Sequence, residues 1–334
     1  MKALRLHGTG DLRLHEEPLP EPGVGELLLR VTAVGLCGSD RHWFVEGGIG
    51  DAVLARPLVL GHEFVATVEA GPRAGERVAL DPAIPCGRCA LCLSSRRHLC
   101  PELRFAGHAS TDGALRSFMA WPEPLAHRLP DSLSEPEGAL LEPLGVALHA
   151  LQLAHAERGT TAAVFGCGPI GLLLVQALRA FGASRIFAAD PLPHRASAAA
   201  ELGATRLLAP GDARAAAVDV AFEVAGEDAA LGDALDTVAP GGRVVLVGIP
   251  DGDRTCFTAS TARRKGVTLL LSRRMEPADL PRAIGLVEEG GVELGPLVTA
   301  RYALSQGQAA FDDLVARRGL KTIVEPQRSN GSAP

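Results

Sequence analysis

The sequence lacks any run of apolar residues long enough to cross a membrane. A transmembrane helix needs about 20 consecutive apolar residues, and no stretch of the 334 residues approaches that length. The first residues, Met1 to Leu14, alternate polar and apolar side chains as a strand does, and do not resemble a signal peptide. We therefore expect a cytoplasmic protein with no membrane partner, in which the seven cysteines stay reduced.

The sequence also has no excess of basic residues. It carries 33 Lys and Arg against 39 Asp and Glu, a formal net charge of −6, whereas nucleic-acid binding needs a clustered basic surface. We therefore expect no nucleic-acid partner. Hydrophobic residues make up 47% of the chain and charged residues 22%, which is typical of a folded globular protein, and the length favours two domains.

The composition and the expected secondary structure of the sequence change near residue 145. The preceding part is rich in Gly, Pro and short β-type segments such as Glu26 to Ala33 and Val59 to Ala70, which predicts a β-rich domain. From 145 to 276, short apolar strands alternate with Ala- and Leu-rich helices, and this alternation predicts a doubly wound parallel sheet of α/β class. Two further helices, Asp279 to Glu289 and Gln306 to Arg317, then lead into a last strand, Lys321 to Val324.

Four cysteines fall within fifteen residues, at Cys86, Cys89, Cys92 and Cys100. Gaps of two residues rarely give a pair of cysteines the Cα separation and Cβ directions that a disulfide needs. Four thiolates can instead surround one tetrahedral Zn²⁺ at about 2.3 Å each. Because protein ligands would fill every position, we expect a structural zinc site that takes no part in the chemistry.

A glycine motif, Gly166-Cys167-Gly168-Pro169-Ile170-Gly171, follows the strand expected at Ala162 to Phe165 and opens a helix. The glycines permit a tight turn and close approach of the backbone to a pyrophosphate, and the helix N-terminus supplies the positive end of its dipole. The next strand ends at Asp190, where a carboxylate can accept the ribose hydroxyls and would repel a 2′-phosphate. Since Arg195 lies five residues beyond Asp190 and not beside it, the pattern favours NAD over NADP.

The expected cofactor contacts extend along the same domain. They are Gly166, Gly168, Pro169, Ile170, Gly171, Asp190, Arg195, Ala225, Gly248, Ile249 and Arg273. Within the turn, Cys167 is interpreted as a small residue without a chemical role.

A second metal site is indicated by three separated segments. Cys37-Gly38-Ser39-Asp40 lies in the β-rich part, His62-Glu63 follows twenty-five residues after Cys37, and Glu142 comes later. A His beside a Glu is more often a surface pair than a ligand pair. Together, however, the segments offer thiolate, imidazole and carboxylate, the donors of an open catalytic zinc site.

These segments give the chain a specific resemblance. The segments at 35–50 (GLCGSDRHWFVEGGIG), 57–63 (PLVLGHE) and 140–150 (LLEPLGVALHA), together with the cysteine lobe and the glycine motif, resemble the zinc-dependent medium-chain alcohol dehydrogenases in order and over essentially the whole length. The first and third segments are most similar to the sorbitol and other polyol dehydrogenases, with L-idonate and butanediol dehydrogenases sharing parts of both. The resemblance implies a GroES-like catalytic domain at 1–144 and 277–334 and a Rossmann domain at 145–276.

The resemblance also implies roles for individual residues. It places Cys37, His62 and Glu63 around a catalytic zinc, with Glu142 as a fourth ligand or as the partner of the zinc-bound water. Ser39 and His42 match positions associated with the proton relay and the cofactor ribose, and the substrate pocket is expected at Trp43, Phe118, Arg301 and Tyr302. Trp43 stands where sorbitol dehydrogenases usually carry a tyrosine, which removes a hydroxyl from the expected pocket.

The function expected from these residues is oxidation of a secondary hydroxyl of a polyol or sugar-derived alcohol by NAD, with two zinc ions per chain. Zinc would lower the pKa of the bound hydroxyl, and the nicotinamide would accept the hydride. Oxidation of an amino or acid sugar, a 2,3-diol or threonine in the same fold stays open, as does a non-catalytic relative. A zinc-ribbon nucleic-acid binder is disfavoured by the acidic charge. The family further suggests a homodimer or homotetramer.

Overall fold

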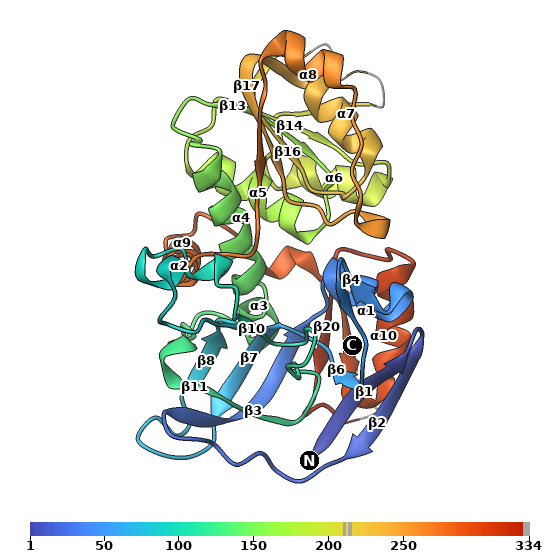
Figure 1. The fold of residues 1–334 in the computed structure, drawn as a ribbon. Coiled ribbons are helices and arrows are strands. Elements are labelled where there is room, and N and C mark those ends of the chain that lie inside the picture. The colour runs from blue at the N-terminus through green and yellow to red at the C-terminus, as the bar shows by residue number, and fades with distance from the viewer. Residues whose placement is uncertain (210–211, 213–215, 330–334) are drawn as a thin grey trace. The chain divides into compact units, whose positions relative to one another are not determined.

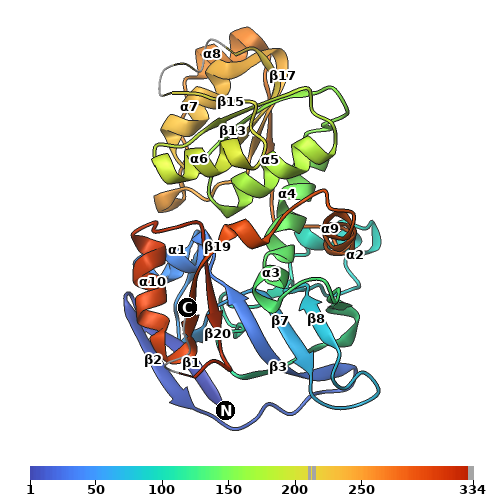
Figure 2. The same cartoon turned by 180° about the vertical axis from the view of Figure 1, so that it is seen from behind.

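The chain forms two compact units, as described for residues 1–209, 212 and 216–329 in a computed structural model. The first unit contains Met1–Glu142, Glu276–Glu288 and the chain from Leu294 onward. The second contains Pro143–Met275 and Glu289–Glu293. Figure 1 and Figure 2 show the helices and strands of each unit from opposite sides.

The first unit is built mainly from strands. Its largest sheet has the order β12-β8-β7-β3-β20-β19, and β11 also pairs with β3. The strands of this sheet are β3 (Glu26–Gly35), β7 (Glu63–Val68), β8 (Arg77–Leu80), β11 (Phe118–Pro122), β12 (Ala126–Arg128), β19 (Val298–Ala303) and β20 (Lys321–Glu325). Buried apolar side chains such as Leu29, Phe64 and Phe311 form its core. The β-rich GroES-like architecture predicted for this part is confirmed.

Smaller elements complete the first unit. A hairpin of β1 (Lys2–Gly8) and β2 (Asp11–Glu16) pairs with β6 (Leu58–Val59), so the alternation at the N-terminus belongs to two strands and not to one. The remaining elements are α1 (Gly38–Glu46), β4 (Gly48–Ile49), β5 (Ala52–Val53), β9 (Ala83–Ile84), α2 (Ala90–Leu93), η1 (Arg97–Leu99), β10 (Arg104–Phe105), η2 (Glu123–Leu125), α3 (Glu135–Gly138), α9 (Asp279–Glu288), η5 (Gly295–Leu297), η6 (Leu304–Gln306) and α10 (Gly307–Val315).

The second unit contains a parallel sheet of six strands in the order β15-β14-β13-β16-β17-β18. Helices cover both faces, with α5 and α6 in front of the sheet in Figure 2 and α7 and α8 in front of it in Figure 1. The elements are α4 (Leu141–Leu153), which starts at the unit boundary, β13 (Thr161–Phe165), α5 (Pro169–Ala180), β14 (Arg185–Ala189), α6 (Pro193–Glu201), β15 (Arg206–Leu207), β16 (Val218–Glu223), α7 (Asp228–Thr237), β17 (Val238–Leu246), η4 (Asp251–Asp253), α8 (Ala259–Lys265) and β18 (Thr268–Leu271). The strand order reverses between β13 and β16, where open α/β sheets bind dinucleotides. The predicted Rossmann sheet is confirmed.

A break between two strands of the β-rich unit sets the position of two candidate metal ligands. The segment Val59 to Ala70, expected as a β-type segment, breaks at Gly61, whose φ of +92° strongly favours glycine. A Cβ at Gly61 would lie 2.7 Å from Val34 Cγ1, so packing also requires glycine there. The break separates β6 from β7 and places His62 and Glu63 at the start of β7.

Candidate active site and metal centres

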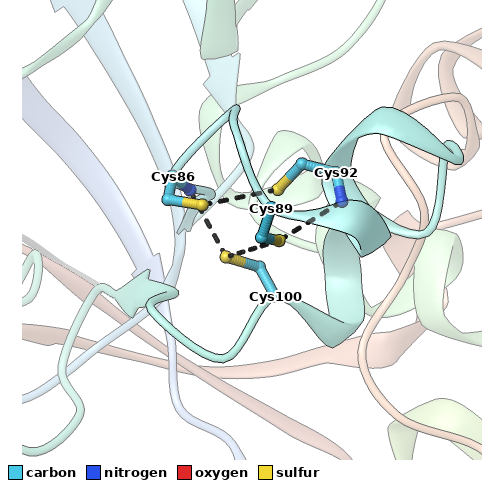
Figure 3. Close-up of side chains that lie close together, drawn as sticks. All are labelled: Cys86, Cys89, Cys92 and Cys100. Carbon is cyan, nitrogen blue, oxygen red and sulfur yellow. Dashed lines mark hydrogen bonds between the residues drawn. The ribbon is translucent and has the colours of Figure 1, made fainter.

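The four lobe cysteines lie around a common centre (Figure 3). One ligand atom from each lies within 4.8 Å of the others, and the Sγ atoms of Cys86 and Cys92 are 3.9 Å apart, as are those of Cys89 and Cys100. Four sulfurs at about 2.3 Å from one tetrahedral Zn²⁺ would be about 3.8 Å apart. All four thiols are free of disulfides, so the geometry fits the structural zinc site that the spacing predicts.

Backbone amides stabilise thiolates in this lobe. The N–H of Cys92 donates to Cys89 Sγ, and the N–H of Cys86 donates to Cys100 Sγ, each at 3.4 Å. Backbone hydrogen bonds from Arg88 and Cys89 lower the pKa of Cys86 to about 7, while burial raises the pKa of Cys92 to about 12. A metal that binds all four sulfurs must therefore displace protons.

The second group of donors comes from two turns of the first unit. Cys37 is the N-cap residue of α1, and His62 and Glu63 follow the break at Gly61. Their ligand atoms lie within 4.8 Å of one another, and Glu63 and His62 are 1% and 6% exposed. Thiolate, imidazole and carboxylate in this arrangement suit zinc, and three protein ligands leave one position for a substrate. The residues present therefore fit a catalytic zinc ion.

Asp40 links these two turns, although sequence reasoning assigned it no role. Its carboxylate accepts the backbone N–H of Cys37 at 2.9 Å and that of Gly61 at 3.2 Å, and Oδ1 lies 3.7 Å from His62 Nδ1. Burial lowers the pKa of His62, but Asp40 and Cys37 outweigh burial and raise that pKa well above its ordinary value. A carboxylate beside Nδ1 leaves Nε2 for a metal, as in many zinc sites.

Lys321 is the second residue that the sequence did not reveal. It begins β20, is 1% exposed, and forms an ion pair with Glu63 Oε2 while its Nζ donates to the carbonyl of Leu36 at 2.9 Å. Apart from this ion pair, no described residue donates a hydrogen bond to either oxygen of Glu63. A Cβ at Gly35 would lie 2.3 Å from Glu63 Oε2, so this glycine makes room for the buried pair.

Three further residues lie around the donor group. Glu142, in the first turn of α4, is 6% exposed but does not belong to the group of ligand atoms within 4.8 Å. Burial raises its pKa to about 8, so it can donate or accept a proton near neutrality. Ser39 Oγ is 3.4 Å from His62 Nε2, and the ring of Phe105 packs on the His62 ring with centroids 5.2 Å apart.

His42 lies on α1, one helical turn from Glu46. Its Nδ1 is 2.6 Å from Glu46 Oε1, and the imidazole is buried. A partner on Nδ1 leaves Nε2 for a second hydrogen bond.

The structure does not bring the four expected substrate-pocket residues together. Trp43 is 2% exposed in the hydrophobic core, edge-on to His108, and the hydroxyl of Tyr302 donates to Asp313. Phe118 lies opposite Arg30 in the strand pairing. Arg301 forms a bidentate ion pair with Glu325 and lines a separate cavity of about 350 Å³. Glu325 lies four residues along β20 from Lys321, about 13 Å at strand spacing.

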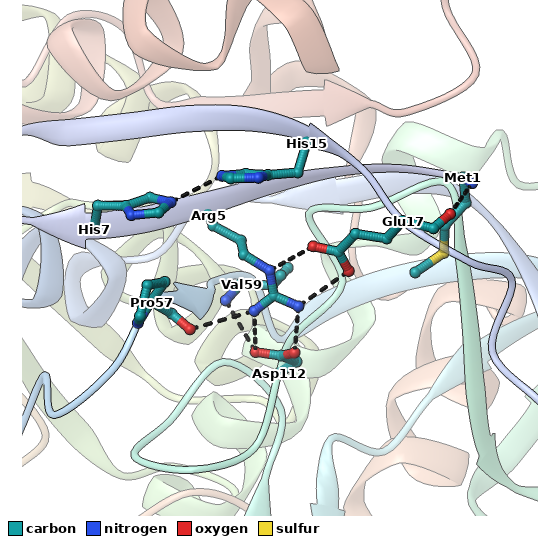
Figure 4. A network of polar contacts seen from close by, with 8 residues as sticks. All are labelled: Met1, Arg5, His7, His15, Glu17, Pro57, Val59 and Asp112. Atoms are coloured by element: carbon teal, nitrogen blue, oxygen red, sulfur yellow. Dashed lines mark hydrogen bonds and ion pairs between the residues drawn. The ribbon is translucent and has the colours of Figure 1, made fainter.

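A polar network fastens the hairpin to the loop that covers the His62 turn (Figure 4). Arg5 forms ion pairs with Glu17 and Asp112. Asp112 also accepts the N–H of Val59 at 3.2 Å, and the following Gly113 donates to the carbonyl of Val59 at 2.7 Å. The network thus holds the strand that ends just before Gly61.

The glycine turn of the second unit has the expected geometry. Gly166 has φ +101°, and a Cβ at Gly171 would lie 1.9 Å from Gly166 O. Asp190 accepts the N–H of Cys167 at 2.8 Å and that of Leu192 at 2.8 Å. Arg195 reaches back to the turn despite its distance in sequence, because its Nη1 lies 3.7 Å from the position of a Cβ on Gly168. Burial, reinforced by Asp190, raises the pKa of Cys167 to about 12, so this thiol stays protonated.

The other expected cofactor residues follow neighbouring strands of the same sheet. Ala225 comes after β16, while Gly248 and Ile249 come after β17. Arg273 comes after β18 and is exposed. Among the described residues, no helix has both the length and the apolar character of a membrane span.

Comparison with known proteins identifies related families and structures. Residues 23–131 match the alcohol dehydrogenase GroES-like domain, and residues 169–289 match the zinc-binding dehydrogenase domain. The sorbitol dehydrogenase of Bacillus subtilis is 34% identical over 346 residues, covering 98% of this chain and 98% of that protein.

Two solved structures are similar over nearly the whole chain. L-idonate 5-dehydrogenase from Escherichia coli has a TM-score of 0.91 and 28% identity, covering 97% of each chain. A zinc-binding dehydrogenase from Sinorhizobium meliloti, bound to NADP, has a TM-score of 0.87 and 31% identity, covering 97% of this chain and 99% of the other. With its two metal-donor groups and its nucleotide turn, the chain belongs to the zinc-dependent medium-chain alcohol dehydrogenase family and uses zinc and a nicotinamide cofactor.

Proposed function

We propose that this protein oxidises a secondary hydroxyl of a polyol or sugar-derived alcohol, with NAD as the hydride acceptor. The observation that carries the proposal is the group of half-buried Cys37 with buried His62 and Glu63, which provides only one thiolate. A carboxylate in place of a second thiolate makes the donor set harder, which suits oxygen-rich substrates. The 34% identity to a sorbitol dehydrogenase supports the same substrate class.

Separate residues of the chain would bind the metal, orient a ligand and carry the proton. Cys37, His62 and Glu63 hold zinc, and Asp40 fixes the orientation of His62. When bound, zinc supplies a Lewis acid that lowers the pKa of the substrate hydroxyl, and NAD supplies the hydride acceptor. Ser39, 3.4 Å from His62 Nε2, would accept the hydroxyl proton as it passes its own to the imidazole of His42, which Glu46 supports through Nδ1.

Glu142 acts at the edge of this site. Since it lies outside the group of ligand atoms within 4.8 Å, we assign it to the water or hydroxyl that occupies the open zinc position. Its pKa of about 8 allows it to accept a proton and release it again near neutral pH.

NAD is preferred to NADP because of Asp190. Its two oxygens each hold one backbone N–H and retain lone pairs for ribose hydroxyls, and its charge disfavours a 2′-phosphate. Arg195 would instead favour NADP, because its guanidinium lies beside the glycine turn, where its positive charge could bind a 2′-phosphate. The NADP-bound relative makes the choice of cofactor a direct experimental question.

Two zinc ions per chain are proposed. The four-cysteine lobe offers four protein ligands and no open position, whereas the Cys37 group offers three. The lobe should therefore release its metal more slowly to a chelator than the catalytic site does.

A second candidate substrate is a polyhydroxy acid. The similarity to L-idonate 5-dehydrogenase, at a TM-score of 0.91, favours it. A carboxylate substrate would need a cation, and the lysine beside the site, Lys321, already pairs with Glu63. We therefore rank the neutral polyol first.

We further propose a homo-oligomeric, cytoplasmic enzyme. Strand β18 forms one edge of the parallel sheet, and Leu271 on it is 78% exposed. An open edge with an exposed apolar side chain is a surface on which a second copy can add its own edge strand. Free cysteines at both donor groups suit a reducing compartment. Light scattering coupled to size-exclusion chromatography measures the number of copies.

The test of the function is a substrate panel. Zinc-loaded protein is assayed by NADH absorbance with hexitols, pentitols, 2,3-diols, threonine and sugar acids, each with NAD and with NADP. We expect the highest kcat/KM for a pentitol or hexitol with NAD. Turnover confined to simple alcohols or to threonine would contradict the substrate class, and a preference for NADP would contradict the cofactor assignment. A Cys37→Ala variant serves as the control for metal-independent background.

A further inference from the structure

Glu223 is a buried carboxylate that the catalytic scheme does not use. It is the last residue of β16, at the edge where the sheet order reverses, and it is 3% exposed. Its Oε1 accepts the backbone N–H of Ala225 at 2.8 Å and of Gly226 at 2.7 Å, with that of Glu227 at 3.5 Å. The side chain therefore folds back on the turn that follows its own strand. Such burial of a carboxylate is unfavourable unless its hydrogen bonds are kept.

The turn held by Glu223 is wedged between two neighbouring turns. A Cβ at Gly166 would lie 2.8 Å from the amide nitrogen of Ala225, and one at Gly248 would lie 2.1 Å from the amide nitrogen of Gly226. Gly248 also faces the second carboxylate oxygen, since its Cβ would lie 2.9 Å from Glu223 Oε2. The backbone carbonyl of Glu223 accepts the N–H groups of Val247 and Gly248. Glu223 thus contacts both turns: its side chain binds the turn after β16, and its backbone carbonyl binds the turn after β17.

The direction of the peptide groups in this turn follows from these bonds. In a trans peptide the carbonyl points away from the N–H of the next residue, and no cis peptide bond occurs among the described residues. Because the N–H groups of Ala225 and Gly226 point at the carboxylate, the carbonyls of Val224 and Ala225 point away from it. They are acceptors, so they suit the hydroxyl and amide donors of a dinucleotide and not its phosphates.

We propose that Glu223 is a positioning residue for the nicotinamide cofactor: its carboxylate fixes the turn at 224–226 so that backbone carbonyls of this turn accept hydrogen bonds from the bound dinucleotide. The proposal rests on the proposed function, because it requires that a dinucleotide binds at the reversal point between β13 and β16. Glu223 itself touches only the protein backbone, so its loss acts on cofactor affinity through the turn.

The experiment compares two isosteric substitutions on the same strand. Glu223→Gln removes the charge at the carboxyl end of β16. The control, Asp219→Asn, alters a carboxylate at the opposite end, where Asp219 Oδ2 accepts the N–H and hydroxyl of Thr161 at 2.8 and 2.7 Å. NADH binding is measured by the change in NADH fluorescence, alongside the thermal midpoint and the separate kcat and KM values for NAD and for alcohol.

We expect Glu223→Gln to raise the Kd for NADH about 10-fold, because the charge-assisted hydrogen bonds to the turn become weaker, neutral ones. The KM for NAD should rise in parallel, whereas kcat at saturating NAD and the KM for alcohol stay close to wild type. Glu223→Ala should have a larger effect in the same direction. Asp219→Asn should change the Kd by less than about twofold, even where it lowers the thermal midpoint as much.

A second variant tests the same turn with the carboxylate intact. Gly248→Ala inserts a methyl group where only 2.1 Å separates it from the amide nitrogen of Gly226, so it should also weaken NADH binding. If Glu223→Ala and Glu223→Gln fail to fold, Gly248→Ala alone tests whether the turn at 224–226 positions the cofactor. Unchanged NADH affinity in Glu223→Gln, or in Gly248→Ala, overturns the positioning role. A wild-type protein that binds neither NADH nor NADPH refutes the proposed function itself, and this role with it.

Discussion

Replacing Lys321 by methionine removes the only cation that contacts Glu63 within the described part of the chain. The ammonium group pairs with Glu63 Oε2 and donates to the carbonyl of Leu36 at 2.9 Å, and both side chains of the pair are 1% exposed. Methionine has similar length and volume, so the change removes charge and a donor without opening a large cavity. What remains is a buried carboxylate that has lost its lysine counter-ion.

The size of the effect depends on the metal. Removal of one partner from a buried ion pair destabilises a protein by about 3–5 kcal/mol. Zinc beside Glu63 supplies a substitute positive charge, so the zinc-loaded variant should lose much less than the metal-free variant. By linkage, the variant then binds catalytic zinc more tightly than wild type, because the metal stabilises the folded state more.

The assay is unfolding in urea with and without a chelator that strips the catalytic zinc. We expect the larger loss of unfolding free energy in the stripped Lys321→Met protein. Glu63→Gln combined with Lys321→Met should recover most of it, since the double variant has no buried charge to compensate. A loss below about 1 kcal/mol in the stripped protein, the range of an exposed ion pair, would refute the reasoning.

Three other predictions concern the site. Zinc binding at the proposed catalytic position should weaken as pH falls. Asp40 and Cys37 raise the pKa of His62 against the effect of burial, and the protonated imidazole must lose its proton before it binds metal. Titration with a competing chelator at about pH 6 and about pH 8 measures the zinc affinity, and equal affinities at the two pH values would contradict the prediction. Glu142→Gln should retain zinc but lower kcat by about 10–100-fold, measured with the best polyol and checked by metal analysis. Asp190→Gly should raise the KM for NAD with little change in kcat, since the ribose contact is remote from the hydride; a variant with wild-type KM would remove Asp190 from the cofactor site.

The sequence predicted most of the sites that depend on local spacing. The cysteine lobe and the glycine turn each lie within one short segment, so their geometry follows from chain connectivity. Residue type pointed to a second donor group at Cys37 and His62-Glu63, and the structure brings these two turns together; their catalytic role stays a prediction. Asp40 stands within a quoted motif, but its contacts with Gly61 and His62 depend on how α1 packs against the His62 turn.

Long-range pairing explains what the sequence did not reveal. Lys321 reaches Glu63 only because β20 pairs with β3, and β3 in turn pairs with β7, across nearly the whole chain. Arg301 was expected at the substrate because the family resemblance implied it, but its neighbour in space, Glu325, is set by strand register. The strands β18 and β19 were also missed: β18 has four residues and no alternation of burial, whereas β19 has six residues whose burial does alternate.

The cysteine lobe has a consequence beyond its own fold. Its two ends are joined by the pairing of β9 with β10, in which Ile84 lies opposite Arg104, and the next residue, Phe105, rests on the His62 ring. The loop that carries the four thiolates is therefore also the support of one wall of the catalytic zinc site. Oxidation confined to these four thiols would release the lobe's metal and free that wall to shift, and would lower activity even where Cys37, His62 and Glu63 remained chemically intact. A metal in the cysteine lobe, although it takes no part in the reaction, would in this way make the enzyme sensitive to the redox state of its surroundings.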